Sequence, residues 1–303
     1  MSSNSAIEWT THTFNPWWGC TKVHDGCKHC YAEATDARWG GDHWGPRASR
    51  RMILGEWGKP AKWDAEARAA GRIDRVFCAS MCDIFEDFDG PVVDQQDRPV
   101  PMRDQVGNWT VPRLRRRALE MVRDTPNLDW LLLSKRPENA VRMCTEVWGE
   151  PDRWPRNVMF GTSPCNQATA DECIPALLRV PGRRFLSCEP LLGAVDLTNI
   201  RLANGGRLHA TGGTVTFADP PAGYCGPSLD WVIVGGESGG KARPFNVEWA
   251  RSIVTQCKAA GVPVFYKQGG SSNRCEHDSK GGCFGCFPPD LQVREFPIGP
   301  SPC

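Results

Sequence analysis

Three cysteines near the start of the chain have the spacing of a metal site. Cys20, Cys27 and Cys30 lie within eleven residues, and their neighbours are Gly and Lys rather than apolar residues. Thiolates so close in sequence can converge on one metal centre, and iron–sulfur clusters are held by cysteines at such spacings. A 4Fe–4S cluster on three cysteines leaves one iron open for a substrate or cofactor. The alternative is a closed tetrahedral zinc site completed by His24 or His29.

A second group of cysteines lies in a tail that has little material for a hydrophobic core. Cys275, Cys283 and Cys286 fall within residues 269–303, a stretch that is rich in Gly and Pro and has no helical pattern. Small segments with too little apolar burial commonly depend on a bound metal. Either zinc or a second iron–sulfur cluster would order this tail, and the alternative is an unstructured tail with incidental thiols. His277 lies nearby and Cys303 is the last residue of the sequence, while Cys225, in the other irregular insertion, could supply a fourth ligand.

Polar residues follow the apolar runs that are predicted as strands. In parallel α/β folds the ligand lies at the carboxyl ends of the strands, so polar residues recurring there favour a functional mouth. The residues in such positions are Asp83, Glu86, Asp87, Lys135, Arg136, Thr162, Ser163, Asn166, Gln167, Glu189, Glu237, Lys267 and Gln268. For each carboxylate the alternative is a salt bridge inside the fold, with Lys135, Arg136 or Lys267 as its partner.

The elements that must position these residues alternate between strand and helix. Continuous apolar runs at 75–81, 130–134, 158–161, 184–188, 231–234 and 262–266 are typical of parallel strands covered on both faces. Helices are predicted over 111–124, with Pro112 in the first turn, and over 247–260, ending at Gly261. The alternation predicts an α/β fold, arranged either as a parallel barrel or as a doubly wound sheet.

Three segments interrupt this alternation. Residues 40–64 form an insertion after the first helix, residues 204–228 are predicted as a hairpin or lid, and residues 269–303 form the cysteine-rich tail. The predicted domains are therefore residues 1–268, which contain both insertions, and residues 269–303.

Composition excludes several classes of protein. The chain has 303 residues, 40% hydrophobic and 23% charged, which excludes a disordered or collagen-like chain. Its net charge of +1 excludes a generic polyanion binder but permits a local basic patch. No apolar stretch approaches the roughly 20 residues that span a bilayer, and residues 1–10 lack a signal-peptide pattern. The 15 cysteines, an odd number, argue against a disulfide framework. We therefore expect a soluble, cytoplasmic protein with no membrane partner.

Tryptophans and basic residues are interleaved in the first fifth of the chain. Aromatic rings among cations can stack bases while the cations hold phosphates, so a nucleic-acid partner is one interpretation. The best candidates for such a surface are residues 47–51 and the arginines at 113–117. The alternative, at least as favoured, is that the tryptophans pack around a cluster.

The first cysteine loop and several later motifs carry a family resemblance. A Cys-x6-Cys-x2-Cys run just after the first predicted strand resembles the cluster loop of radical S-adenosylmethionine enzymes, whose commoner spacing is x3 then x2. The chain departs from that pattern again at His29, where an aromatic residue usually precedes the last cysteine. A closer resemblance is to a phage- and prophage-borne family of poorly defined function that is grouped with these enzymes. The motifs that carry it are residues 7–10, 14–16, 31–33, 76–86, 133–137, 186–192, 231–244 and 261–268.

This resemblance implies a fold and a set of roles. The fold is a partial (β/α)6-type TIM-like barrel with irregular insertions, holding a 4Fe–4S cluster and S-adenosylmethionine in its mouth. Cys20, Cys27 and Cys30 correspond to the cluster ligands. By position, Ser80 and Asp83 correspond to contacts with the methionine amino group, Ser163 and Asn166 to ribose or carboxylate contacts, and Glu189 and Glu237 to ribose or substrate contacts. An electron donor of the flavodoxin or ferredoxin type is the implied partner.

Three functional hypotheses follow. The leading one is a radical S-adenosylmethionine enzyme that generates a 5′-deoxyadenosyl radical and acts on a nucleic acid or nucleobase. The second is a zinc-stapled nucleic-acid-binding protein with no radical chemistry. The third is an iron–sulfur redox or sensor protein that does not cleave the cofactor.

Overall fold

The computed structural model describes residues 5, 7–102, 106–218 and 221–298. They divide into two compact units. The first unit contains the residues up to Val23 and residues Cys30–Met159, and the second contains His24–His29 and Phe160–Ile298. Of the first three cysteines, Cys20 and Cys30 belong to the first unit and Cys27 to the second.

The secondary structure is a parallel sheet with helices and one antiparallel insertion. The parallel strands, in their order across the sheet, are β1 (His12–Phe14), β3 (Asp74–Cys78), β5 (Leu128–Leu133), β6 (Val158–Thr162), β7 (Arg183–Cys188), β12 (Trp231–Gly235) and β13 (Val264–Gln268). The helices are α1 (Tyr31–Arg38), α2 (Lys59–Ala69), α3 (Val111–Asp124), α4 (Ala140–Trp148), α5 (Gln167–Leu178) and α6 (Val247–Ala260). The remaining strands are β2 (Arg50–Arg51), β4 (Val92–Val93), β8 (Ile200–Arg201), β9 (Arg207–His209), β10 (Thr214–Ala218) and β11 (Pro221–Cys225).

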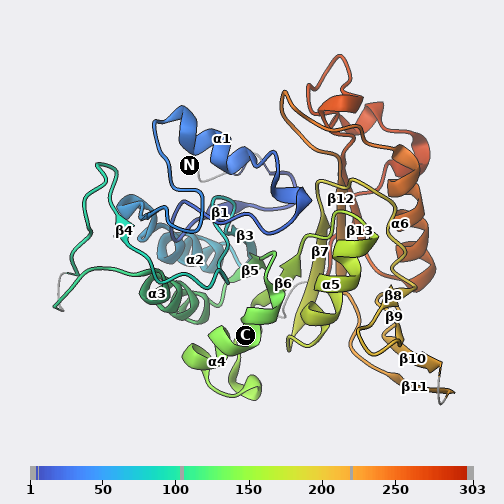
Figure 1. The fold of residues 1–303 in the computed structure, drawn as a ribbon, viewed down its shortest axis with the longest axis horizontal. Helices are drawn as coiled ribbons and strands as arrows, with labels where there is room; N and C mark the ends of the chain where they lie inside the picture. The colour runs from blue at the N-terminus through green and yellow to red at the C-terminus, as the bar shows by residue number, and fades with distance from the viewer. Residues whose placement is uncertain (1–4, 6, 103–105, 219–220, 299–303) are drawn as a thin grey trace. The chain divides into compact units, whose positions relative to one another are not determined.

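In the first unit, β1, β3 and β5 run parallel, and Val76 of β3 pairs with His12 on one side and with Trp130 on the other. Helix α2 packs against β3 and β5 (Figure 1). The core between them is aromatic, because Phe14 meets Trp57 and Trp130 edge-on at centroid distances of 5.4 and 5.7 Å. These buried contacts hold the carboxyl end of β1, from which the first cysteine loop departs.

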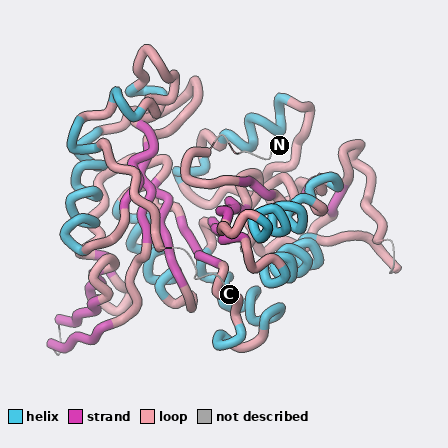
Figure 2. The backbone as a smooth tube through the Cα atoms, turned by 180° about the vertical axis from the view of Figure 1, so that it is seen from behind, coloured by secondary structure: helices cyan, strands magenta, loops and turns pink. Residues whose placement is uncertain are grey.

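In the second unit, β12 lies between β7 and β13, and all three strands are parallel. Helix α6 packs along β12 and β13 (Figure 1). The described part of the connection from β7 to β12 contains no helix. It contains the antiparallel sheet β11-β10-β9-β8 instead, and its β10–β11 hairpin extends away from the parallel strands (Figure 2). The hairpin predicted within residues 204–228 is thereby confirmed.

The α/β class and the parallel strands are confirmed, but the fold is not a regular (β/α)6 barrel. The parallel sheet has seven strands rather than six. The strand–helix alternation breaks between β7 and β12, where the antiparallel sheet replaces a crossover helix. No helix in the described part of the chain is long and apolar enough to cross a membrane.

Two helices have the bounds that the sequence predicts. α3 spans Val111–Asp124 with Pro112 in its first turn, and α6 spans Val247–Ala260. Gly261 ends α6 with a φ of 67°, a left-handed conformation in which its N–H bonds back to the last turn. Pro112 lies in the first turn of α3 and Gly261 lies directly after α6, so each residue is close in sequence to the helix end that it determines.

The far end of the tail is anchored to the sheet by backbone hydrogen bonds. Tyr266 N donates to Val293 O at 2.9 Å, and Glu295 N donates to Val264 O at 3.0 Å. Trp231 Nε1 adds a bond to Glu295 O at 2.9 Å. The middle of the tail, before Phe287, has no comparable strand pairing to β13 among its described residues.

Candidate functional site

The three cysteines of the first loop are half-buried and form no disulfide. Cys27 ends a short 3-10 helix, Asp25–Cys27, and Cys30 is the residue that caps the start of α1. Neither histidine of the loop is without a partner. His24 Nδ1 accepts from Gly26 N at 3.0 Å, and His29 Nδ1 lies 3.3 Å from Glu237 Oε2.

Cys20 lies beside a cation and two carboxylates of its own unit. Arg136 Nη1 donates to Cys20 Sγ at 3.7 Å, and the same guanidinium donates to Thr21 O at 2.7 Å. Burial, together with the charges of Asp83 and Glu86, raises the pKa of the Cys20 thiol to about 12, although Arg136 opposes the rise. Cys20 is thus a thiol at neutral pH, and a bound metal would have to displace its proton.

A buried ion network holds the backbone after Cys20. Arg50 is fully buried and binds Glu86 through two bonds, Nε to Oε2 at 3.0 Å and Nη2 to Oε1 at 2.9 Å. Glu86 Oε1 also accepts from Thr21 N at 2.8 Å. Because Thr21 is held from both sides, by Glu86 and by Arg136, the conformation of the Cys20 segment depends on this network.

Asp83 is one of the expected cofactor contacts, but both of its carboxylate oxygens already accept hydrogen bonds from the protein. Its Oδ2 accepts from Arg136 Nη1 at 2.8 Å and from Lys135 N at 3.1 Å, and its Oδ1 accepts from Ser134 Oγ at 2.5 Å. The salt-bridge alternative therefore describes its position in the structure. Ser80, in contrast, is partly exposed, and its hydroxyl bonds the side-chain amide of Asn15 at 3.1 Å.

Two expected contacts follow β6 in the second unit, and one of them has a structural role. Asn166 caps α5, because its Oδ1 accepts from Thr169 N at 3.0 Å while its own N donates to Thr169 Oγ1 at 3.1 Å. Ser163 is buried at the end of β6. Asn166 is thus fixed by the helix start rather than turned toward a ligand.

Glu189 lies at the end of β7 and pairs with a lysine at the end of β13. Lys267 Nζ donates to both carboxylate oxygens, at 2.6 and 2.8 Å. Gln268 Nε2 donates to Glu189 Oε1 at 3.2 Å and to Gly236 O at 3.0 Å. The salt-bridge alternative again describes the geometry, but both charged groups keep about a fifth of their side-chain surface exposed, 18% for Glu189 and 19% for Lys267.

Glu237 is the most heavily bonded carboxylate of the second unit. It accepts from Arg243 N at 2.8 Å and from Arg243 Nε at 2.9 Å, and it faces His29. Burial acts to raise the pKa of Glu237, but the bonds from Arg243 and His29 outweigh it and hold this pKa below its usual value. Arg243 also donates to Asp25 O at 3.0 Å, so Glu237 and Arg243 together hold residues 24–29.

Arg243→Ala is expected to destabilise the protein in a pH-dependent way. A carboxyl whose pKa is lowered by folding stabilises the fold above its ordinary value of 4.5, and this contribution disappears as the pH falls through the folded-state pKa. The stability lost in the variant should therefore be largest near pH 7 and shrink as the pH falls below 4.5 and through the folded-state pKa of Glu237. Urea unfolding of both proteins across this range measures it.

The matched control for that experiment is Arg142→Ala. Arg142 forms ion pairs with Asp87 and Glu146, and all three side chains are largely exposed. Its loss should cost at most about 0.5 kcal/mol. A stability difference between wild type and Arg243→Ala that stays constant with pH would contradict the assigned role of Arg243.

The tail brings four potential metal ligands together. Cys275, His277, Cys283 and Cys286 each offer one ligand atom, and these atoms lie within 4.8 Å of one another. They form the one such group of three or more His, Cys, Asp or Glu residues in the part of the chain that the structure describes. The predicted ligands Cys275, Cys283 and Cys286 are thus brought together, and this group could bind a metal such as zinc. The side chain of Cys225 and the whole of Cys303 lie outside the described residues.

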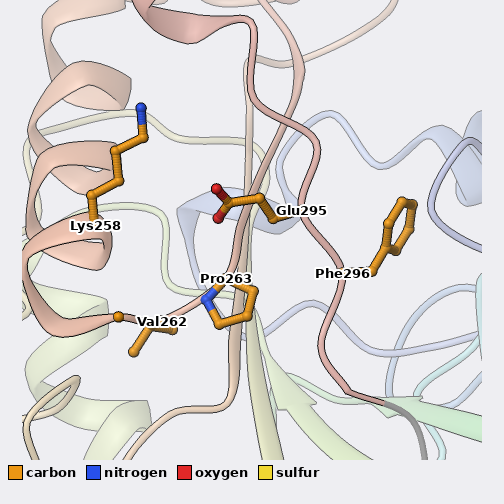
Figure 3. A pocket seen from close by; sticks show the side chains of 6 residues that line it. Lys258, Val262, Pro263, Glu295 and Phe296 are labelled. Carbon is orange, nitrogen blue, oxygen red and sulfur yellow. The ribbon is translucent and has the colours of Figure 1, made fainter.

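A pocket lies elsewhere in the second unit, beside the end of α6. Lys258 lines it from α6, and Glu295 and Phe296 line it from the tail (Figure 3). Glu295 is committed to the fold, because its Oε2 accepts from Val264 N at 3.0 Å. The pocket contains none of the predicted site residues.

A comparison with protein families places the chain. The model of a family described as a protein of unknown function (DUF5131) matches residues 4–96 and 101–284. The chain belongs to this family. No curated protein and no solved structure matches it. The DUF5131 match includes the whole first cysteine loop and the tail ligands Cys275, His277 and Cys283, and it ends two residues before Cys286.

Three arginines of the basic surfaces predicted for this DUF5131 member are buried, while Arg47, Arg113 and Arg116 are exposed. Arg50 and Arg51 are buried and pair with Glu86 and Asp36. Arg115 of α3 is buried as well and donates to Ile84 O at 2.8 Å. Residues 47–51 and 113–117 therefore do not form a continuous basic surface. Most tryptophans of the first unit pack in the core, and the cation–π pair of Arg117 with Trp57, at 4.5 Å, belongs to this packing.

Two residues have contacts that the sequence analysis does not predict. Arg243 holds the first cysteine loop through Glu237 and Asp25 O, and His277 joins the three tail cysteines. A usable signal existed for His277, since it lies between cysteines in a segment without a core. Arg243 had no such signal, because its partner loop lies far away in sequence.

Proposed function

We propose that the chain is a radical S-adenosylmethionine enzyme whose 4Fe–4S cluster is ligated by Cys20, Cys27 and Cys30. The observation that carries the proposal is the donor set: three cysteines without disulfide partners lie on one short loop and are half-buried, whereas most other described cysteines outside the tail are buried. In the zinc alternative, His24 or His29 would be the fourth ligand. Each histidine already uses Nδ1, for Gly26 N and Glu237 Oε2 respectively, so ligation by either would have to use Nε2.

The ion networks of the two units would serve this site by positioning its loop. Arg136 places positive charge next to Cys20 Sγ, which would offset the negative charge of a thiolate-ligated cluster. Asp83 would act by orienting Arg136, and Glu237 by orienting His29 and Arg243, rather than by touching the cofactor. Ser80 and Glu189, whose side chains are partly exposed, are the stronger candidates for contact with S-adenosylmethionine.

When bound, the reduced cluster supplies one electron that cleaves the sulfonium, giving methionine and a 5′-deoxyadenosyl radical that abstracts a hydrogen atom from the substrate. The electron would come from a flavodoxin- or ferredoxin-like protein. The resemblance to radical S-adenosylmethionine enzymes supports a partial barrel of parallel strands around the cluster. The phage association of the family that the chain resembles favours a nucleic acid or nucleobase as the substrate class. The protein's share is to hold the ligands, orient the cofactor and exclude water.

Anaerobic reconstitution with iron and sulfide, followed by reduction with dithionite in the presence of S-adenosylmethionine, tests the proposal. The protein should be brown, bind about four irons at this loop, and release 5′-deoxyadenosine and methionine in equal amounts, as chromatography would detect. The same mixture without dithionite is the control and should release neither.

Two other outcomes would support the other hypotheses. A colourless protein that carries only zinc and takes up no iron would favour the zinc-stapled binding protein. A brown protein that releases no 5′-deoxyadenosine after reduction would favour an iron–sulfur redox or sensor protein.

A further inference from the structure

The ligand group in the tail has the composition and spacing of a structural zinc site. Its ligands follow the pattern Cys-x-His-x5-Cys-x2-Cys over residues 275–286. Cys275 and Asp278 form a bridge that turns the chain, and Cys283 precedes the 3-10 helix Phe284–Cys286, which brings Cys286 back toward it. His277 Nδ1 lies 3.3 Å from Cys286 Sγ, within the edge length of a zinc tetrahedron.

We infer that this tail binds one Zn²⁺ through Cys275, His277, Cys283 and Cys286. Three thiolates and one imidazole are a common structural zinc set, and four protein ligands leave no open position for catalysis. Iron–sulfur clusters are held by thiolates, and histidine ligation is the exception among them. The donor set therefore favours zinc over a second iron–sulfur cluster.

The segment needs a metal because it buries no side chain of its own. Between residues 269 and 286 the buried residues are all glycines: Gly269, Gly270, Gly281 and Gly282. The first buried apolar side chain after them is Phe287. Hydrophobic burial thus contributes little here, while ordering each residue costs backbone entropy. Metal ligation can supply the missing free energy.

The segment that contains the zinc ligands, residues 269–286, in turn holds the loop that carries Glu237. Ser271 N donates to Glu237 O at 2.9 Å, and Ser271 Oγ accepts from Gly239 N at 3.0 Å. The two loops touch through glycines, since a Cβ on Gly236 would lie 2.5 Å from Gly269 O. Gly269 N reaches Gly281 O at 2.8 Å and so ties this contact to the metal-ligating turn. We therefore expect zinc binding to help hold Glu237 in place through these backbone contacts.

Metal analysis of the full-length protein tests the inference, which does not depend on the proposed function. Protein purified anaerobically should contain one zinc per chain beyond any iron. The double variant Cys283→Ser/Cys286→Ser should lose that zinc and become sensitive to protease beyond Gly269, while its iron uptake persists. Cys173→Ser, a cysteine outside both groups, is the matched control and should keep the zinc.

Substitution of Co²⁺ for zinc tests whether His277 is the fourth ligand in a protein that keeps all three cysteines. The full chain with Co²⁺ in place of zinc should show intense visible bands of a tetrahedral thiolate site. His277→Ala should shift these bands and release the metal more readily to a chelator, whereas His277→Cys should retain it. Equal zinc in the parent and the double variant, or loss of iron instead of zinc, would overturn the inference. Bands unaffected by His277→Ala would overturn the assignment of the fourth ligand.

Discussion

Cys27→Ala is expected to abolish binding of the 4Fe–4S cluster and, with it, release of 5′-deoxyadenosine. Removing one of three protein ligands leaves two thiolates, too few to retain the cluster. The fold should persist, because the short helix Asp25–Cys27 contains no buried residue, so its contribution to the hydrophobic core is small. Iron analysis, visible absorbance and chromatography of the reconstituted variant measure the loss.

The control for this variant is Cys173→Ala, which lies on α5 and outside both cysteine groups. It should keep the iron content and the product yield of the parent. The zinc of the tail should survive in both variants, since its ligands belong to a separate segment. Full cluster occupancy in Cys27→Ala would show that the ligands have been misassigned.

Glu86→Ala is expected to have the largest effect on stability. The side chain of Arg50 is fully buried and that of Glu86 is 3% exposed, so the variant would leave a buried guanidinium without its carboxylate. Breaking a buried ion pair in this way costs about 3–5 kcal/mol. Urea unfolding measures the loss. The variant should also retain its cluster less well, because Thr21 N loses its acceptor next to Cys20.

Two comparisons isolate the cause of that effect. Lys62→Ala removes an exposed pair with Glu66 on α2 and should change the free energy of unfolding by at most about 0.5 kcal/mol. The double variant Arg50→Met/Glu86→Leu removes both charges but leaves the carbonyls of His43, Gly45 and Ala48 without their donor, so it should recover only part of the lost stability. A loss below about 1 kcal/mol in Glu86→Ala would contradict the view that Arg50 depends on this carboxylate.

The sequence by itself determined the elements whose signals are local. The bounds of α3 and α6 follow from apolar spacing, Pro112 and Gly261, all of which lie within the helix or next to it. The parallel strands follow from short apolar runs, because a strand buried on both faces needs apolar residues at successive positions. The two cysteine groups could also be predicted, because the members of each group are close in sequence.

Only the tertiary structure decided which polar groups meet. Arg50 and Glu86 are 36 residues apart, Glu189 and Lys267 are 78 apart, and Arg136 reaches Thr21 across 115 residues. No local pattern encodes such pairs, so the carboxylates at strand ends could be interpreted equally well as cofactor contacts or as salt bridges. The structure also turned Arg115 inward, where it donates to Ile84 O across 31 residues. The physical reason is common to all of these: a charged or ligating side chain takes whichever partner folding brings near, and chain topology sets that choice rather than the neighbouring residues.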